Sequence, residues 1–328
     1  MRYSILIPEA IHEKGVAFLL EKGYEVKQGT SPLEDVVAKE VAGCDAILTR
    51  NAVISERVMR ASKQLKVVAM HGVGVDRIDV QAATRLGIQV VNAKDSNKLA
   101  VAEFTIGLLI ALSRNLLLYD KGLRAGNWQI RRRLGTDLED TTLGIIGMGA
   151  IGSMVAQKAV TGLAMNVIAY KRDITGAIPM PGVTYTANME DVLRAADYLS
   201  LHIPYTSATQ RLIGRRELVL MKPNAFLINT ARGEVVDNKA LYEALRDKKI
   251  AGAALDVFPG EIPDPSDPLL TLDNVILTPH AAAFTEQSVA RMSLYAASGI
   301  HEVLSGQAPT RPVNRLCQMA MVSAGAGN

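Results

Sequence analysis

Short apolar runs alternate with helical patterns along almost the whole chain. Most of the runs are continuously apolar, which is typical of parallel strands that are covered on both faces. The predicted strands are residues 4–8, 46–49, 67–71, 89–92, 142–147, 166–170, 198–201, 225–229, 252–257 and 275–278. The alternation of such strands with helices predicts βαβ units with right-handed crossovers, and so a doubly wound α/β fold.

Helical patterns fill the intervals between these strands. They include residues 55–61, 151–160 and 238–246, and we interpret Asn238 as an N-cap that follows Asp237. A longer pattern extends from about residue 98 to residue 124 and ends at the breaker 125–127. Its apolar residues surround most of the helix, which predicts a helix buried between two domains or two subunits.

The strands form two sets, one before and one after the long helix. A chain of 328 residues is long enough for two domains that each bury a core. A last helix, residues 285–305, follows the second set, and we expect it to return to the first. The prediction is therefore a discontinuous domain of residues 1–98 and 286–328, a second domain of residues 99–285, and a cleft between them. The small, polar segment 319–328 is expected to be disordered.

Composition excludes several classes of partner. The 36 Lys and Arg against 33 Asp and Glu give a net charge of +3, too small for a nucleic-acid or membrane-surface footprint. No apolar run reaches the roughly 18 residues of a membrane span, and the first nine residues read as a strand, not a signal peptide. Cys44 and Cys317 provide neither a disulfide framework nor a metal-ligand spacing. We expect a cytoplasmic protein without a metal site.

A glycine-rich turn links one predicted strand to the next helix. Gly147, Gly149 and Gly152 form a Gly-x-Gly-x-x-Gly pattern between strand 142–147 and helix 151–160, and a further strand follows. Gly147 permits a tight turn, Gly149 lets the backbone approach a pyrophosphate, and Gly152 lets the helix pack closely on the sheet. The N–H groups at the helix start, at Ala150 and Ile151, would then bind phosphate. A glycine turn without a ligand is the alternative, and the βαβ context favours a dinucleotide site.

The end of the following strand indicates which dinucleotide binds. An NAD site is expected to have a carboxylate there for the ribose 2′-hydroxyl, but Lys171 and Arg172 occupy these positions. Two cations would attract a 2′-phosphate, so the sequence favours NADP(H). NAD(H) is the alternative, in which both cations are solvated and Asp173 binds the ribose.

Further motifs resemble one known family. Residues 229–237 (NTARGEVVD), 254–261 (ALDVFPGE) and 278–282 (TPHAA), together with 71–76 and 97–103, are similar to those of the D-isomer-specific 2-hydroxyacid dehydrogenases. The resemblance extends in order over about residues 1–315. It implies two Rossmann-like domains, with 1–98 and 286–328 as the substrate (catalytic) domain and 99–285 as the dinucleotide-binding domain. It also implies a homodimer joined largely through the long linking helices.

The resemblance also implies the roles of individual residues. Arg232, Glu261 and His280 would form the catalytic site, and the backbone of Val73 and Gly74 would hold the substrate carboxylate with Arg232. Asp256 would face the nicotinamide amide. The rest of the cofactor site would be lined by His202, Pro204, Thr230, Ala231 and Ala282.

Elementary chemistry agrees with these roles. Hydride transfer to a keto carbon leaves charge on oxygen, and His280 has the side chain best suited to exchange a proton near neutral pH. A carboxylate such as Glu261 would orient the imidazole and favour its charged form. Arg232 is a planar fork that stays charged and fits a carboxylate. Each of these residues alone is more often a solvated loop residue or a surface cap. All three follow strands of one sheet, and that convergence favours an active site.

The sequence departs from many relatives at two positions, Phe104 and Ile262, and both changes would alter the substrate pocket. Glu261 disfavours formate as a substrate, since related formate dehydrogenases carry Gln there. No regulatory domain is expected after the core.

Arg50 follows a strand and either binds a distal acidic group of the substrate or is a surface residue. The remaining three residues, His71, Cys44 and Trp128, are interpreted as packing or backbone-positioning residues.

We therefore predict an NAD(P)-dependent oxidoreductase that acts on a small 2-hydroxy or 2-keto acid. Glyoxylate/hydroxypyruvate reduction and 3-phosphoglycerate oxidation are the two substrate types considered. The alternative from another functional class is a cofactor-sensing, corepressor-like binding protein, because such a protein would keep both the fold and the three polar residues.

Overall fold

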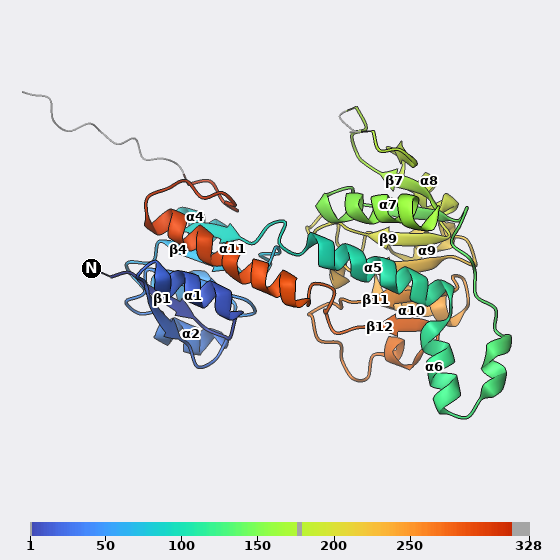
Figure 1. The fold of residues 1–328 in the computed structure, drawn as a ribbon, viewed down its shortest axis with the longest axis horizontal. Coiled ribbons are helices and arrows are strands. Elements are labelled where there is room, and N and C mark those ends of the chain that lie inside the picture. The colour runs from blue at the N-terminus through green and yellow to red at the C-terminus, as the bar shows by residue number, and fades with distance from the viewer. Residues whose placement is uncertain (1, 176–178, 317–328) are drawn as a thin grey trace, which may run out of the picture. The chain divides into compact units, whose positions relative to one another are not determined.

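The computed structural model describes residues 2–175 and 179–316 and divides the chain into two compact units (Figure 1). The smaller unit consists of residues 1–97 and 285–328, and the larger consists of residues 98–284. Each unit is built on a fully parallel sheet, which confirms the predicted α/β class with two Rossmann-like, doubly wound sheets. The segment 319–328 lies outside the described residues.

The smaller unit has a five-stranded sheet in the order β2-β1-β3-β4-β5. Helices α1 and α11 cover one face, and α2, α3 and α4 cover the other. The strands are β1 (Ser4–Ile7), β2 (Glu25–Gln28), β3 (Ala46–Thr49), β4 (Val67–Met70) and β5 (Gln89–Asn92). The helices are α1 (Glu13–Glu21), α2 (Glu34–Glu40), α3 (Glu56–Arg60), α4 (Val80–Arg85) and α11 (Glu286–Leu304).

The larger unit has a seven-stranded sheet in the order β12-β11-β10-β9-β6-β7-β8. Helices α5 and α7 cover one face, and α8, α9 and α10 cover the other. The strands are β6 (Thr142–Ile146), β7 (Asn166–Tyr170), β8 (Val183–Thr186), β9 (Tyr198–Leu201), β10 (Phe226–Asn229), β11 (Gly252–Leu255) and β12 (Val275–Leu277). The helices are α5 (Lys98–Ser113), α6 (Leu116–Arg124), α7 (Ala150–Leu163), α8 (Met189–Ala195), α9 (Arg215–Leu220) and α10 (Asn238–Arg246), with 3₁₀ turns η1 (Trp128–Arg132), η2 (Gly233–Val235) and η3 (Pro268–Thr271).

All ten predicted strands are present, but β2 and β8 are absent from the sequence prediction. Both are edge strands, β2 of the five-stranded sheet and β8 of the seven-stranded sheet. None of their residues is buried, unlike the fully buried β1, β3 and β4. An edge strand lacks the continuous apolar run that marks a strand covered on both faces, so the hydrophobic pattern does not reveal it.

The prediction of one helix from residue 98 to residue 124 is wrong. The chain forms two helices, α5 and α6, which are bent by 60° at the break between them. Asn115 lies at the break with a left-handed φ of 52°, and its side-chain amide donates to the Leu134 carbonyl at 3.0 Å. Asn tolerates this conformation better than most residues, and so the helix ends there although the apolar pattern continues.

A smaller correction concerns the start of α10. The N-cap is Asp237, whose carboxylate accepts from the Ala240 N–H at 3.1 Å, whereas Asn238 is the first helical residue. Among the described residues, no single helix has both the length and the hydropathy to cross a membrane, although α5 and α6 reach that limit as a bent pair.

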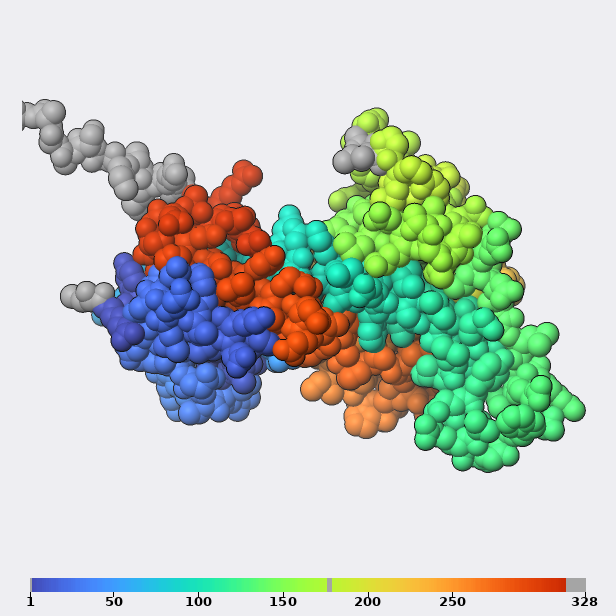
Figure 2. Space-filling view, viewed as in Figure 1, coloured from blue at the N-terminus to red at the C-terminus, as the bar shows by residue number. Residues whose placement is uncertain are grey.

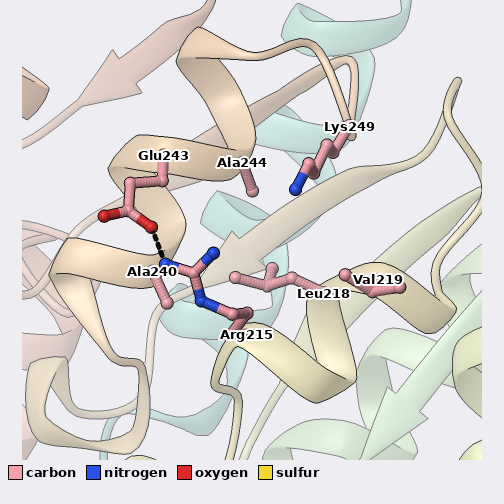
Figure 3. A pocket seen from close by; sticks show the side chains of 7 residues that line it. All are labelled: Arg215, Leu218, Val219, Ala240, Glu243, Ala244 and Lys249. Carbon is pink, nitrogen blue, oxygen red and sulfur yellow. Dashed lines mark hydrogen bonds and ion pairs between the residues drawn. The ribbon is translucent and has the colours of Figure 1, made fainter.

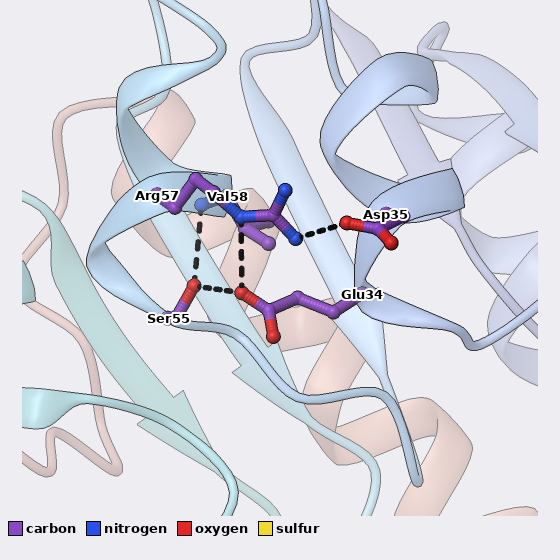
Figure 4. Close-up of polar contacts among 5 residues, drawn as sticks. All are labelled: Glu34, Asp35, Ser55, Arg57 and Val58. Carbon is purple, nitrogen blue, oxygen red and sulfur yellow. Dashed lines mark hydrogen bonds and ion pairs between the residues drawn. The ribbon is translucent and has the colours of Figure 1, made fainter.

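On the surface of the smaller unit, polar contacts join α2 to α3 (Figure 4). The Arg57 guanidinium pairs with Glu34 and with Asp35, and the Ser55 hydroxyl donates to Glu34 at 2.5 Å. The Ser55 hydrogen bond, with a contribution from Arg57, holds the pKa of the Glu34 carboxyl below its usual value. These contacts are exposed and join α2 to α3, so we interpret them as a structural network of ion pairs.

Two glycines determine how closely α7 approaches the sheet. Gly147, directly after β6, has φ +107°, and a Cβ atom there would lie 2.4 Å from the His202 carbonyl oxygen. A Cβ atom on Gly152 would lie 2.0 Å from the Gly147 carbonyl oxygen. Any side chain at Gly152 would therefore push the first turn of α7 away from the sheet.

We predict that Gly152→Ala lowers the free energy of unfolding by about 1–3 kcal/mol, because the added methyl group is forced against backbone. Gly162→Ala is the matched control: Gly162 lies in the same helix, and a Cβ atom there meets nothing within 4 Å. That control should raise stability by about 0.5–1 kcal/mol, since alanine favours the helix. Urea denaturation measures both, and equal effects would disprove the close contact.

The buried His71 leads to a prediction about pH. Its side chain is 5 % exposed, and neither ring nitrogen has a hydrogen-bond partner within the described residues. Burial, reinforced by the nearby Arg50, lowers the pKa of the imidazole to about 4. The unfolded chain titrates near 6.5, so it binds more protons between these two values. The stability contributed by neutral His71 is therefore complete above about pH 6.5 and decreases as the pH falls toward 4, by up to about 3 kcal/mol.

We expect His71→Phe to lose stability less steeply than wild type between pH 6.5 and 4 in urea denaturation, with little change at pH 7. The apolar ring breaks no hydrogen bond, because neither His71 nitrogen forms one. His202, whose pKa burial also lowers to about 4, is present in both proteins, so the difference isolates His71. Identical pH slopes would assign the acid sensitivity to another group.

Candidate active site

The carboxyl ends of the strands of the larger unit are aligned in one row. Ile146 pairs with Leu201, Leu201 with Asn229, and Asn229 with Leu255. The next residues continue the pairing, since the N–H groups of His202, Asp256 and Thr278 donate to Ile146, Asn229 and Leu255 at 2.8–3.0 Å. The order of the strands reverses between β6 and β9, the position where open α/β sheets bind ligands.

The glycine turn lies at this position and leaves donors exposed. Gly149 is the N-cap of α7, and a Cβ atom there would meet nothing within 4 Å. The following N–H groups, of Ala150, Ile151 and Gly152, belong to the first helical turn and have no intrahelical acceptor. Open space beside Gly149 and N–H groups at the start of a 14-residue helix fit a pyrophosphate group.

Two cations follow β7, the strand next to β6. Lys171 is half-buried and Arg172 is exposed, and within the described residues neither side chain forms a hydrogen bond or an ion pair. The Asp173 carboxylate accepts from the Thr175 N–H at 2.9 Å and from the Thr175 hydroxyl at 2.5 Å. These bonds, with the charge of Lys171, hold the pKa of Asp173 below its usual value. The carboxylate is thus bound within its own turn.

His202 follows β9 on the other side of the strand reversal. One ring nitrogen, Nε2, is 2.9 Å from the Ser200 hydroxyl, and burial lowers the pKa of the ring to about 4. His202 is therefore neutral at pH 7. Pro204, two residues later, is exposed, and its carbonyl accepts from the Thr209 hydroxyl at 2.7 Å.

Asn229, the last residue of β10, organises the loop that carries Arg232. Its buried side chain accepts from the Ala231 N–H at 3.0 Å and donates to the Arg232 carbonyl at 2.9 Å. The Arg232 guanidinium is half-buried, and its Nη1 donates to the Ala231 carbonyl at 2.7 Å. The Thr230 hydroxyl lies 3.0 Å from that of Thr105 on α5, so this hydroxyl is already used within the larger unit.

The Arg232 loop lies against the loop that carries Glu261. A Cβ atom on Gly233 would lie 2.1 Å from the backbone of Phe258, and the Gly260 N–H donates to Glu234 at 3.2 Å. Only a residue without a side chain permits this approach. The two loops are thereby fixed to each other at the carboxyl edge of the sheet.

Glu261 and His280 form a pair. Oε1 of Glu261 is 3.6 Å from Nδ1 of His280, and both side chains are partly exposed. Both residues are in left-handed backbone conformations, with φ +76° for Glu261 and φ +53° for His280. Such values are uncommon outside glycine and concentrate at functional sites.

Asp256 holds the His280 turn in place. Its side chain is fully buried, and one oxygen accepts from the Thr278 hydroxyl at 2.6 Å and the Ala281 N–H at 2.8 Å. The other oxygen accepts from the N–H of the buried Ala282 at 2.9 Å. The Asp256 carbonyl also accepts from the His280 N–H at 2.8 Å. The four bonds surround His280 and determine where its ring projects.

The larger unit therefore brings together the glycine turn, His202, Arg232, Glu261, Asp256 and His280 at one sheet edge. Val73 and Gly74 belong to the smaller unit, where they follow β4. Asn229 and Thr278 also organise the site, although the sequence predicts no role for either side chain. A polar residue at the end of a buried strand is the signal that would have identified Asn229.

Two cavities in the described part of the larger unit lie away from this edge. One of about 10 Å³ between α9 and α10, lined partly by Arg215 and Glu243, is too small for more than a water molecule (Figure 3). One of about 400 Å³ lies at the amino ends of β6, β9 and β10. Its lining includes Glu139, Asp140 and Asp197, which would repel the phosphates of a dinucleotide. Within the described residues, no three His, Cys, Asp or Glu side chains are grouped as metal ligands.

Comparison with known proteins agrees with this geometry. Residues 106–282 match the model of the family described as "D-isomer specific 2-hydroxyacid dehydrogenase, NAD binding domain". The glyoxylate reductase of Korarchaeum cryptofilum is 37% identical over 327 residues, which cover 96% of this chain and 97% of that protein. The D-3-phosphoglycerate dehydrogenase of Methanocaldococcus jannaschii is 40% identical over 313 residues, 95% of this chain. The match spans only 59% of that relative's length.

A solved structure extends the similarity to three dimensions. The NADPH-dependent glyoxylate/hydroxypyruvate reductase of Sinorhizobium meliloti, in complex with NADP and malonate, has a TM-score of 0.85 and 30% identity. The match covers 95% of this chain and 97% of that one. These relatives are dehydrogenases and reductases, so the corepressor-like alternative is not supported. With the family model over more than half of its length, the chain belongs to the D-isomer specific 2-hydroxyacid dehydrogenases, and its larger unit contains the domain that binds their nicotinamide cofactor.

Proposed function

We propose that this protein transfers a hydride between a nicotinamide cofactor, preferably NADP(H), and the second carbon of a small 2-keto or 2-hydroxy acid. The observation that carries the proposal is the pairing of His280 with Glu261 at the same sheet edge as the glycine turn. A proton donor and a phosphate-binding turn at the same edge of one sheet are the two parts that such a reaction requires.

His280 is proposed as the general acid and base. Its Nδ1 faces Glu261, which leaves Nε2 to exchange a proton with the substrate oxygen. In reduction the ring gives a proton to the keto oxygen, and in oxidation it takes the proton from the hydroxyl group. The bound cofactor supplies or accepts the hydride. The Glu261 carboxylate orients the ring and stabilises the charged imidazolium.

The substrate carboxylate needs donors of its own. We propose that Arg232 binds it through the guanidinium fork and polarises the adjacent carbonyl group. In the smaller unit, the backbone N–H groups of Val73 and Gly74 are proposed as further donors. Glyoxylate, hydroxypyruvate and 3-phosphoglycerate remain the substrate types that these groups fit, since each carries a carboxylate beside the reacting carbon.

The cofactor residues follow from the same edge. Residues 147–152 would bind the pyrophosphate, and the nicotinamide half would be lined by His202, Pro204, Thr230, Ala231 and Ala282. The Asp256 carboxylate already accepts three hydrogen bonds from its own chain. We propose that it positions the His280 turn and has one acceptor site left for the nicotinamide amide.

We propose a homodimer for the full chain. Large apolar side chains are exposed along the segment 116–134 of the larger unit, whose surface Figure 2 shows in green; they are Leu116, Leu117, Leu123, Trp128 and Leu134. Trp128 is 60 % exposed and Leu134 is 86 % exposed. Several large apolar side chains exposed on one segment indicate an association site, and a second copy is the partner that the family resemblance implies.

The test of the proposed function is the reduction of glyoxylate, hydroxypyruvate and related 2-keto acids by wild type and by His280→Ala. We expect His280→Ala to lower kcat by about 10²–10⁴-fold, because the proton donor is lost. Its affinity for the cofactor, measured by fluorescence titration, should stay close to that of wild type. Glu261→Gln should also lower kcat and shift the pH–rate profile, since the imidazolium loses its partner.

The control is His301→Ala, which removes another imidazole, one that is bonded to Tyr24 in the smaller unit. This variant should keep the wild-type kcat. Near wild-type turnover by His280→Ala would contradict the assigned mechanism, whatever the cofactor.

The choice of cofactor gives a separate prediction. We expect wild type to have a kcat/KM at least about tenfold higher with NADPH than with NADH, since one charge-assisted hydrogen bond to the 2′-phosphate provides that factor. Asp173 is bound within its own turn, and this also disfavours a ribose contact. Lys171→Ala combined with Arg172→Ala should remove the preference.

A matched control removes the same charge elsewhere on the larger unit, at the exposed pair Lys248 and Lys249, both replaced by Ala. The preference for NADPH should survive in that protein. A wild type that prefers NADH would show that Lys171 and Arg172 are solvent-facing residues without a role in cofactor selection.

A further inference from the structure

The loop after β4 in the smaller unit is bonded to the end of β5. The Ala93 N–H donates to the Gly72 carbonyl at 2.8 Å, and the Asn92 side-chain amide donates to the Val73 carbonyl at 2.7 Å. Two successive carbonyl groups, those of Gly72 and Val73, therefore point toward the same short segment. One is held by backbone and the other by a side chain.

Peptide planarity then determines the direction of the next two N–H groups. In a trans peptide the C=O and N–H groups point to opposite sides of the chain. The Gly72 carbonyl shares its peptide with the Val73 N–H, and the Val73 carbonyl shares its peptide with the Gly74 N–H. Both N–H groups are consequently turned away from the β5 segment. Within residues 2–175 and 179–316, neither donates to an acceptor.

Adjacent N–H groups that point outward form an anion-binding concavity. If the peptide between Val73 and Gly74 were rotated by half a turn, its carbonyl oxygen would face the anion and repel it. The backbone alone does not prevent this rotation, because Gly74 has no side chain to limit it and Val73 is 36 % exposed. The Asn92 amide is the group that selects one orientation.

Asn92 is itself firmly held. It pairs with Met70 in the β4–β5 register, and its N–H donates to the Arg311 carbonyl at 3.3 Å. Its side-chain oxygen accepts from the Lys94 N–H at 3.2 Å, which orients the amide so that its NH₂ group faces Val73. The Asn92 amide is therefore fixed by a hydrogen bond at its own backbone N–H group and by another at its side-chain oxygen.

We infer that Asn92 is a positioning residue for substrate: it holds the Val73–Gly74 peptide with its N–H group outward, so that the loop binds the carboxylate of a 2-keto acid. The inference rests on the proposed function. Asn92 does not touch the substrate, but it influences the affinity for the substrate carboxylate through the Val73–Gly74 peptide. Replacing Asn92 should therefore weaken the binding of substrates that carry a carboxylate and leave the binding of the cofactor unchanged.

The test uses the full chain and three variants. Asn92→Ala removes the amide donor. Asn92→Asp keeps the shape and replaces the donor by a carboxylate oxygen, which repels the Val73 carbonyl and favours the rotated peptide. Gln64→Ala is the matched control in the same unit, because the Gln64 amide also donates to a backbone carbonyl, that of Gly43 at 2.6 Å. Gln64 precedes β4, at the opposite edge of the sheet.

We expect the KM for glyoxylate and hydroxypyruvate to rise about tenfold in Asn92→Ala, the effect of one hydrogen bond, and at least as much in Asn92→Asp. The kcat at saturating substrate should change less than threefold, and the KM for NADPH should not change. Binding of oxamate, a 2-keto acid analogue that is not reduced, should weaken by the same factor in calorimetry. Gln64→Ala should match wild type in every measurement.

The outcomes separate this inference from the proposed function. An active wild type whose Asn92 variants keep KM and oxamate affinity within twofold would overturn the role of Asn92 alone. A fall in kcat with an unchanged KM would also overturn it, because that pattern indicates a general structural defect. A wild type that neither reduces 2-keto acids nor binds oxamate would refute the proposed function, and the inference with it.

Discussion

The site of the larger unit depends on the register of its parallel sheet. Because β6, β9, β10 and β11 end in line, the residues that follow them become neighbours although they are far apart in sequence. Hydrogen bonds from His202, Asp256 and Thr278 to the adjacent strand continue the ladder one residue beyond the sheet. A shift of one strand by a single residue would turn its side chains to the other face and move its loop out of the row. The position of every polar group in the site therefore rests on strand pairing.

The smaller unit has a similar sheet edge, but there an internal carboxylate accepts hydrogen bonds from the N–H groups at the strand reversal. Its strand order reverses between β1 and β3, and the N–H groups of Arg50, Asn51 and Ala52 converge there. The carboxylate of Glu9, just after β1, accepts all three. An internal carboxylate thus takes the place where a ligand anion binds in other open sheets. Within the described part of this unit, the N–H groups of the Val73–Gly74 loop after β4, one strand further along, remain available as donors.

The sequence predicts the interior of this fold better than its periphery. Strands such as β3 and β9 are predicted to the residue because burial on both faces favours a continuous apolar run. The edge strands β2 and β8 lack that run, and the break at Asn115 depends on a contact with Leu134 that no local pattern reveals. Capping shows the same limit, since Asp237 and Asn238 are both good N-cap residues and only the backbone geometry decides between them.

The candidate site shows the same division between local and distant information. The glycine turn can be read from sequence because its spacing reflects one local conformation. The clamps made by Asp256 and Asn92 cannot, because each joins a strand end to a loop 25 or 19 residues away in the chain, whose position follows from the folded sheet. A family resemblance identifies which residues gather at the site, but it does not say which of them hold the others in place.

The conformations of Glu261 and His280 show why such clamps are needed. A left-handed backbone costs a residue with a side chain about 1–3 kcal/mol, and glycine would avoid that strain at either position. Glycine carries no ionisable group, however, so the proposed proton-transfer pair at these two turns requires the strained residues. The strain is tolerated because nearby bonds fix the backbone: Asp256 holds the turn on both sides of His280, and the Glu261 N–H donates to the Phe258 carbonyl at 3.0 Å. Through these bonds the buried Asp256 carboxylate contributes to the orientation of the His280 ring toward Glu261.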